Sequence, residues 1–271
     1  MLALMLSMPN RAAAADGRQI LFVQGNIEFI LLHELAHVVI NDFDIPIIGA
    51  EENAADYIAT IVLIRADRFD PERADRARLF LSAVAHGFAT EWDVKRPVIN
   101  ELPFWDSHAL GMQRFFQIGC LLYGSSPSTF PNLPARIGMP QARAEQCASE
   151  FRKAEKSINW LFDTYGLQSG QEAAEVTIDY QAVPSRTSQR LLAAMREDLI
   201  IESSVARIRS RFALPEPLAI VARSCRKPTA LWDPAKRTIT ICYELFDYYY
   251  LLAINSSAKA RDTLLKEEGI K

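Results

Sequence analysis

Residues 27–41 read IEFILLHELAHVVIN, and this stretch decides the fold. It is apolar on nearly every side, which is typical of a helix buried inside a domain. Within it, His33, Glu34 and His37 form an H-E-x-x-H pattern. On a helix, positions i and i+4 share one face, so both imidazoles can point at one ion. The stretch therefore predicts a buried helix that carries a metal site.

Two core histidines without a metal are the alternative interpretation of this pattern. That alternative leaves two polar rings and a carboxylate without partners on a buried helix, which is energetically costly. The chain also has only 4 histidines among its 271 residues, so a chance match is rare. The pattern favours zinc, which His33 and His37 would bind at about 2.0–2.1 Å, with Glu34 beside the same face and within reach of a metal-bound water.

A catalytic zinc ion needs a third protein ligand and an open position for water. The metzincin branch is excluded, because it requires a glycine and a histidine at the positions that Ile40 and Phe43 occupy. The next acidic segment, EENAAD at 51–56, is expected to open a second helix. Its Glu52 and Asp56 lie four residues apart, so one carboxylate can bind zinc while the other accepts the spare ring N–H of a ligand histidine.

HELAH followed by EENAAD resembles the Glu-zincins, in particular the E-N-x-A-D helix of neprilysin-type peptidases. This resemblance implies that Glu52 is the third zinc ligand and that Asp56 orients a histidine. Glu51 is then a bystander, unless the register of the helix favours it. More closely, the chain is similar to a bacterial metallopeptidase family described as a domain of unknown function. The segments that match its motifs are 46–56 (P-x-x-G-x-E-E-x-A-A-D), 108–116 (H-x-L-x-x-Q-R-F-Y) and 242–245 (C-Y-E-L).

The order of these motifs departs from that family, because the C-Y-E-L stretch here follows the zinc helix instead of preceding it. Too little chain precedes His33 to build the sheet under which a zincin active helix packs. We therefore expect an α+β, zincin-like fold in permuted order. Residues 16–170 would form a mainly helical region with the zinc site, and residues 171–271 an α/β segment that completes the same catalytic domain. The expected helices span 27–41, 51–68, 71–90, 106–123, 141–165, 187–211 and 245–254, and the expected strands span 20–23, 175–182, 218–222 and 238–243.

The N-terminal residues 1–15 resemble a secretory signal, since an apolar stretch precedes a run of alanines that is typical of a cleavage site after Ala15. A frayed hydrophobic terminus is the alternative, because no basic segment comes first. The four cysteines lack C-x-x-C spacing, which excludes zinc ribbons and thioredoxin-like motifs. Of three possible pairings we favour Cys120–Cys147 and Cys225–Cys242, because each closes a local loop. Signal and disulfides together predict an exported protein, periplasmic or extracellular, whereas buried free thiols are the alternative for a cytosolic one.

Charge and hydropathy exclude several classes of protein. The 30 basic and 33 acidic side chains give a formal net charge of −3, which argues against a nucleic-acid-binding protein. No apolar run approaches the roughly 20 residues that cross a bilayer, so we expect no membrane-spanning segment. Hydrophobic residues make up 49% of the chain, enough for a sizeable core. The expected partner is a peptide or protein substrate, and the sequence does not indicate an oligomeric state.

These patterns together predict a zinc-dependent metallopeptidase. His33, His37 and Glu52 would hold Zn²⁺, which lowers the pKa of a bound water to about 7, and Glu34 would act as the general base. His108 lies at the start of a predicted helix and is the candidate that stabilises the oxyanion. A structural histidine with local hydrogen bonds is the alternative interpretation of His108.

A catalytically inactive zinc-binding or partner-binding protein on the same scaffold is the rival function. Glu34 favours the enzyme, because a structural zinc site has no use for a base and is normally closed by four ligands. Hydrolysis of a non-peptide amide is a third possibility, and the sequence does not separate it from peptide hydrolysis.

Overall fold

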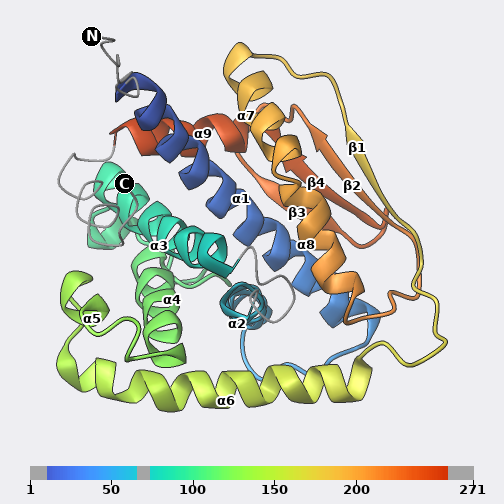
Figure 1. Ribbon diagram of the computed structural model, residues 1–271, viewed down its shortest axis with the longest axis horizontal. Helices are drawn as coiled ribbons and strands as arrows, with labels where there is room; N and C mark the ends of the chain where they lie inside the picture. Colours follow the sequence, from blue (N-terminus) through green and yellow to red (C-terminus); the bar gives the residue numbers. More distant parts are fainter. Residues whose placement is uncertain (1–10, 66–73, 256–271) are drawn as a thin grey trace, which may run out of the picture.

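The computed structural model describes residues 11–65 and 74–255 (Figure 1). Its helices are α1 (Arg11–Asp42), α2 (Glu51–Ile64), α3 (Ala74–Lys95), α4 (Gly111–Ser125), α5 (Leu133–Arg136), α6 (Gln141–Tyr165), α7 (Arg186–Glu197), α8 (Ile200–Arg209) and α9 (Tyr243–Asn255), with a short 3₁₀ helix at Ile99–Glu101. Its strands are β1 (Val176–Tyr180), β2 (Leu218–Arg223), β3 (Ala230–Asp233) and β4 (Thr238–Cys242).

Helix α1 runs through the middle of the molecule, between the helices α2 and α3 and the sheet (Figure 1). Apolar side chains that point in different directions around the helix are buried, among them Val23, Phe29 and Leu35. The helix is longer than expected, and the strand expected at 20–23 is wrong, because these residues belong to α1. The burial of Val23 in the shared core outweighs the local β-propensity of the run.

The sheet has the strand order β1-β2-β4-β3 in the described residues. β1 pairs with β2 and β2 with β4 in parallel, whereas β3 pairs antiparallel with β4. Ile220 stands at its centre, opposite Ile178 on one side and Ile239 on the other. β3 lies at the edge and packs against α1. The expected strands at 218–222 and 238–243 left residues 230–233 outside any strand, which is wrong, because these residues form the short edge strand.

One hydrophobic core joins the helices to the sheet. Leu35 and Ile61 from the helices belong to the same buried cluster as Ile220 and Ile241 from the strands. The described residues therefore form a mainly helical α+β structure in which the C-terminal part supplies a small mixed sheet. The sheet therefore follows α1 in the chain, as expected.

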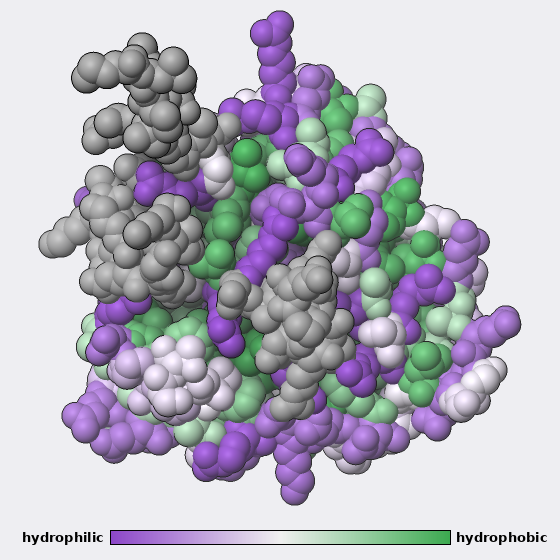
Figure 2. Space-filling model, in the orientation of Figure 1, coloured by the Kyte–Doolittle hydropathy of each residue, from purple (hydrophilic) through white to green (hydrophobic). Residues whose placement is uncertain are grey.

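Helix α6 has its predicted bounds and closes the lower edge of the molecule (Figure 1). It turns Cys147, Phe151 and Ile158 inward, and Figure 2 shows hydrophilic side chains along the lower edge where this helix lies. The segment expected to be one helix at 187–211 is instead two, α7 and α8. The break is at Leu199, whose φ of 52° is left-handed and ends the regular helical backbone.

Both favoured disulfides are present and confirm that prediction. Cys120–Cys147 ties α4 to α6, and Cys225–Cys242 ties the loop after β2 to the end of β4. Of the expected signal segment, residues 1–10 lie outside the described residues, and the backbone of residues 11–15 belongs to α1. Among the residues that the structure describes, no helix is long and apolar enough to span a bilayer.

Candidate metal centre

The two histidines of the H-E-x-x-H pattern lie one turn apart on α1 and face the same side. Their Nε2 atoms are 3.1 Å apart. His33 is 6% exposed and His37 12% exposed, so both rings are largely removed from water. The predicted pairing of two imidazoles on one helical face is therefore present.

Helix α2 brings a carboxylate to the same point. Glu52, in its first turn, places Oε2 3.0 Å from Nε2 of His33 and 3.3 Å from Nε2 of His37. Four ligands at 2.0–2.1 Å around a tetrahedral zinc ion lie about 3.3–3.4 Å from one another. The separations of the three donors, 3.0, 3.1 and 3.3 Å, are close to that spacing. These residues therefore fit a zinc ion after small shifts.

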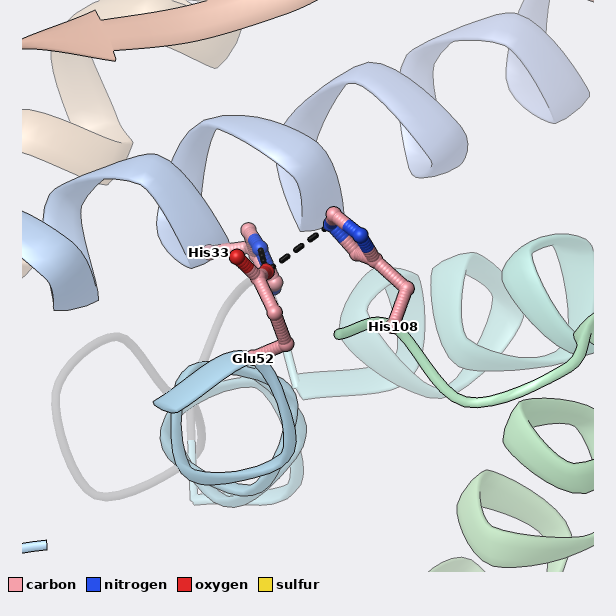
Figure 3. Close-up of side chains that lie close together, drawn as sticks. All are labelled: His33, Glu52 and His108. Atoms are coloured by element: carbon pink, nitrogen blue, oxygen red, sulfur yellow. Dashed lines mark hydrogen bonds and ion pairs between the residues drawn. The ribbon is translucent and has the colours of Figure 1, made fainter. Parts of the chain in front are cut away.

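His108 also reaches this point, from the segment between α3 and α4 (Figure 3). Its Nε2 lies 2.8 Å from Oε2 of Glu52. One ligand atom each from His33, Glu52 and His108 lies within 4.8 Å of the other two. The helix expected from residue 106 begins at Gly111 instead. Residues 106–110 form a loop, because the Asp106 side chain accepts a hydrogen bond from the backbone N–H of His108.

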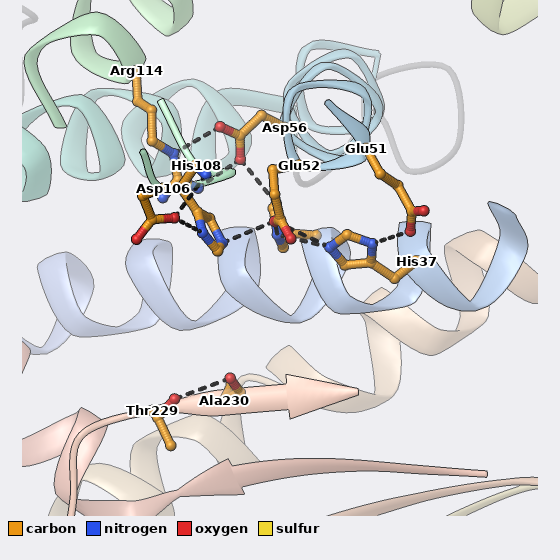
Figure 4. Close-up of polar contacts among 10 residues, drawn as sticks. His37, Glu51, Glu52, Asp56, Asp106, His108, Arg114, Thr229 and Ala230 are labelled. Carbon is orange, nitrogen blue, oxygen red and sulfur yellow. Dashed lines mark hydrogen bonds and ion pairs between the residues drawn. The ribbon is translucent and has the colours of Figure 1, made fainter. Parts of the chain in front are cut away.

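Each of the three imidazoles has a carboxylate at its other nitrogen (Figure 4). The pairs are His33–Asp56 at 2.9 Å, His37–Glu51 at 2.6 Å and His108–Asp106 at 3.0 Å. An ionised carboxylate only accepts, so these contacts favour a proton on Nδ1. The Nε2 lone pairs are then free to face inward, which is the arrangement that metal-binding histidines use.

Asp56 is held in turn by α4. Arg114 donates to both of its oxygens, at 2.7 and 2.6 Å. The guanidinium lies 4.3 Å from the centre of the Phe88 ring. Burial acts to raise the pKa of Asp56, but the hydrogen bond from His33 and the charge and hydrogen bonds of Arg114 outweigh it and lower the pKa. Asp56 thus remains ionised beside His33, where it orients the ring.

The pKa values of His33 and Glu52, which contact each other, are shifted in opposite directions. Burial acts to lower the pKa of His33, yet hydrogen bonds with Asp56 and Glu52 outweigh it and raise the pKa to about 9. The hydrogen bond from His33, against the effect of burial, lowers the pKa of Glu52 to about 2. Without a metal ion, a proton on His33 therefore supplies positive charge beside an ionised Glu52. A divalent cation would replace that proton.

Glu34 is partly buried on the side of α1 that faces the sheet. Its carboxylate accepts a hydrogen bond from the backbone N–H of Trp232 in the edge strand β3. Burial raises the pKa of Glu34, and the charges of His33 and His37 oppose that rise in part. A carboxylate whose pKa lies above its usual range accepts a proton more readily at neutral pH, which suits a general base.

Two residues of this cluster were missed or misjudged from the sequence. Glu51, expected to be a bystander, contacts Nδ1 of His37. Asp106 was not among the predicted site residues. Its position two residues before His108 is nevertheless a usable signal, because an aspartate often accepts a hydrogen bond from the backbone N–H two residues later.

A second group of potential ligands does not form a metal site. The sulfurs of Cys225 and Cys242 are bonded to each other, and the Glu244 carboxylate accepts hydrogen bonds from the backbone N–H groups of Cys225 and Arg226. These groups are therefore already satisfied.

The DUF4344 family, described as "Putative metallopeptidase", matches residues 9–162 and 180–269 of the chain. The two segments include most of the 271 residues and every residue of the cluster described above. The chain belongs to this family. The DUF4344 match leaves out residues 163–179, where the chain leaves α6 and enters β1. No curated protein and no solved structure matches the chain.

Proposed function

We propose that this DUF4344 protein is a zinc-dependent peptidase of the Glu-zincin type. His33, His37 and Glu52 would hold Zn²⁺, with Glu34 as the general base. The observation that carries the proposal is the convergence of three donor atoms at 3.0–3.3 Å from one another, on two helices that bury them. Two imidazoles and one carboxylate form a donor set that catalytic zinc sites use, and it leaves a further position open.

Zinc, when bound, supplies Lewis acidity that polarises a peptide carbonyl and makes water a stronger nucleophile near neutral pH. Glu34 then takes a proton from the attacking water and passes it to the leaving amine. The N–H of Trp232 holds the Glu34 carboxylate in place. Its raised pKa supports both steps, because the carboxylate must first accept and then release a proton.

His108 is proposed to stabilise the oxyanion that forms on the substrate. When the His108 ring is protonated, its Nδ1–H donates to the Asp106 carboxylate, and its Nε2–H points toward the Glu52 carboxylate at the metal centre. A positioned hydrogen-bond donor that faces developing negative charge is among the largest contributions to catalysis of this kind. Asp56 and Glu51 contribute indirectly, since they orient the two histidines of α1.

The carboxylates at the imidazoles also support zinc over an empty polar cluster. A chain of carboxylate, histidine and metal raises the basicity of the ligand and fixes its orientation. The two disulfides are consistent with an oxidising compartment, and we propose that the protein is exported.

The Glu34→Gln variant tests this function. It retains the ligands, so it should bind zinc with unchanged stoichiometry while hydrolysis of a broad fluorogenic peptide library falls by about 10²-fold or more. A wild-type protein that binds zinc and cleaves no peptide would favour the inactive zinc-binding protein. A protein that cleaves non-peptide amides and no peptide would instead be an amide hydrolase with a different substrate class.

A further inference from the structure

His108 is placed like a ligand as well as like an oxyanion donor. Its Nε2 is as close to Oε2 of Glu52, at 2.8 Å, as Nε2 of His33 is, at 3.0 Å. Figure 3 shows the ring directed at the Glu52 carboxylate from the opposite side of the site. This position therefore suits a ligand of the metal as well as a donor to the substrate oxygen.

The Asp106 carboxylate gives His108 the same kind of partner that the other two imidazoles have. It contacts Nδ1 of His108 at 3.0 Å. Asp56 and Glu51 contact Nδ1 of His33 and His37 in the same way. The Asp106 carboxylate also accepts from the backbone N–H of His108, at 2.9 Å. The same contact that prepares the other two imidazoles for a metal ion is therefore present at the third.

The exposure of the four side chains differs in a systematic way. His33, His37 and Glu52 are 6%, 12% and 20% exposed, whereas His108 is 47% exposed. The first three are held on helices, and His108 on a loop whose turns are closed by local hydrogen bonds such as Asp106 N–H to Pro103 O. His108 is thus the donor that can leave the centre with the least loss of packing.

We propose that His108 is a fourth protein ligand of the metal in the substrate-free protein, and that a bound substrate displaces it. The resting site then has three imidazoles and one carboxylate. Once displaced, the same ring is available to the substrate oxygen. This inference rests on the proposed function, because it concerns the same metal centre.

Zinc K-edge X-ray absorption of the zinc-loaded protein counts the imidazoles and needs no activity. We expect three in the wild-type protein and two in His108→Ala. Two imidazoles in both proteins would overturn the assignment. The imidazole count of the wild-type protein decides the question by itself, so the test remains valid even if the His108→Ala protein does not fold.

Affinity and displacement give independent readouts. His108→Ala should weaken zinc binding by at least about tenfold, while Glu34→Gln, which keeps all four donors, should leave the imidazole count at three. A peptide hydroxamate added to wild-type protein should reduce that count from three to two, and a count that stays at three would contradict displacement. Absence of peptide hydrolysis with three imidazoles would contradict the proposed function and leave the ligand assignment intact.

Discussion

At the scale of single residues, the candidate metal centre consists of three imidazoles, each of which contacts a carboxylate through its Nδ1 atom. The three contacts differ in their surroundings, because Asp56 is 4% exposed and bonded to Arg114, whereas Glu51 is 48% exposed. Charge-assisted hydrogen bonds are stronger where water is excluded. Of these contacts, the one between His33 and Asp56 is therefore expected to contribute most to zinc affinity.

This difference predicts a ranking of two matched variants. Asp56→Asn should weaken zinc binding by about 10–100-fold, the range typical for a residue that orients a ligand. Glu51→Gln, five residues away on the same helix, should weaken zinc binding less, because water competes at the exposed position. Isothermal titration with zinc measures both. Equal losses for the two variants would contradict the ranking.

The metal-free protein should lose stability as pH rises. The pKa of His33 is about 9 in the folded state against 6.5 for the free side chain. Between these values the folded protein holds a proton that the unfolded chain has lost. The stabilisation is therefore complete below about pH 6.5 and disappears as pH rises through 9, a change of about 3 kcal/mol.

Urea unfolding of the metal-free protein between pH 6.5 and 9 measures this slope. His33→Asn should flatten it, because the titrating ring is gone. Zinc-loaded wild-type protein should also show a flatter profile, since the metal replaces the proton. A slope that is the same in wild-type and His33→Asn proteins would show that another group causes it.

At the scale of elements, the sequence pattern predicted long helices better than short strands. Helix α6 has its predicted ends because its apolar side chains recur at helical spacing between Pro140 and Gly166. β3 was missed because a four-residue edge strand offers too few positions for a periodic pattern. Pro234, which follows the strand directly, is moreover a residue typical of turns. The break at Leu199 was missed because a left-handed residue other than glycine has no clear compositional signal.

The same contrast applies to the candidate site. His33, Glu34 and His37 are local in sequence, so their spacing alone places them on one face. Glu51 and Asp106 become relevant only through packing between elements, which residue spacing does not specify. The pairing of Arg114 with Asp56 likewise depends on how α4 lies against α2.

The disulfide between α4 and α6 should contribute to stability through the unfolded state. Cys120 and Cys147 are separated by 27 residues, and closing a loop of that length is worth about 3–4 kcal/mol in the chain-entropy description. Reductant should lower the wild-type free energy of unfolding in urea. In a Cys120→Ala/Cys147→Ala protein the remaining response to reductant reports the 225–242 bond. An unchanged wild-type curve under reducing conditions would contradict this contribution.

At the scale of the whole molecule, the first and the last helix that the structure describes pack against each other. Phe22 on α1 and Tyr249 on α9 have ring centres 6.3 Å apart, and α1 packs along α9 (Figure 1). The first and last described helices therefore share one core with the rest of the described residues.

The shared core predicts that the helical region does not fold alone. Residues 16–170 without the sheet would leave the face of α1 against β3 and α9 exposed, and large exposed apolar patches lead to association. Circular dichroism and zinc titration of this fragment should show loss of cooperative unfolding and of zinc binding, with the full chain as control. A well-folded, zinc-binding fragment would contradict the prediction that both halves form one folding unit.

Zinc content of the purified protein tests the central claim most directly, with Glu52→Ala and Asn53→Ala compared in parallel. Asn53 is exposed beside Glu52 on α2, so its substitution controls for changes to the helix. We predict about one zinc ion per chain in wild-type and Asn53→Ala proteins, and loss of zinc from a folded Glu52→Ala protein. Zinc retained in full by Glu52→Ala, or none in the wild-type protein after metal reconstitution, would contradict the account.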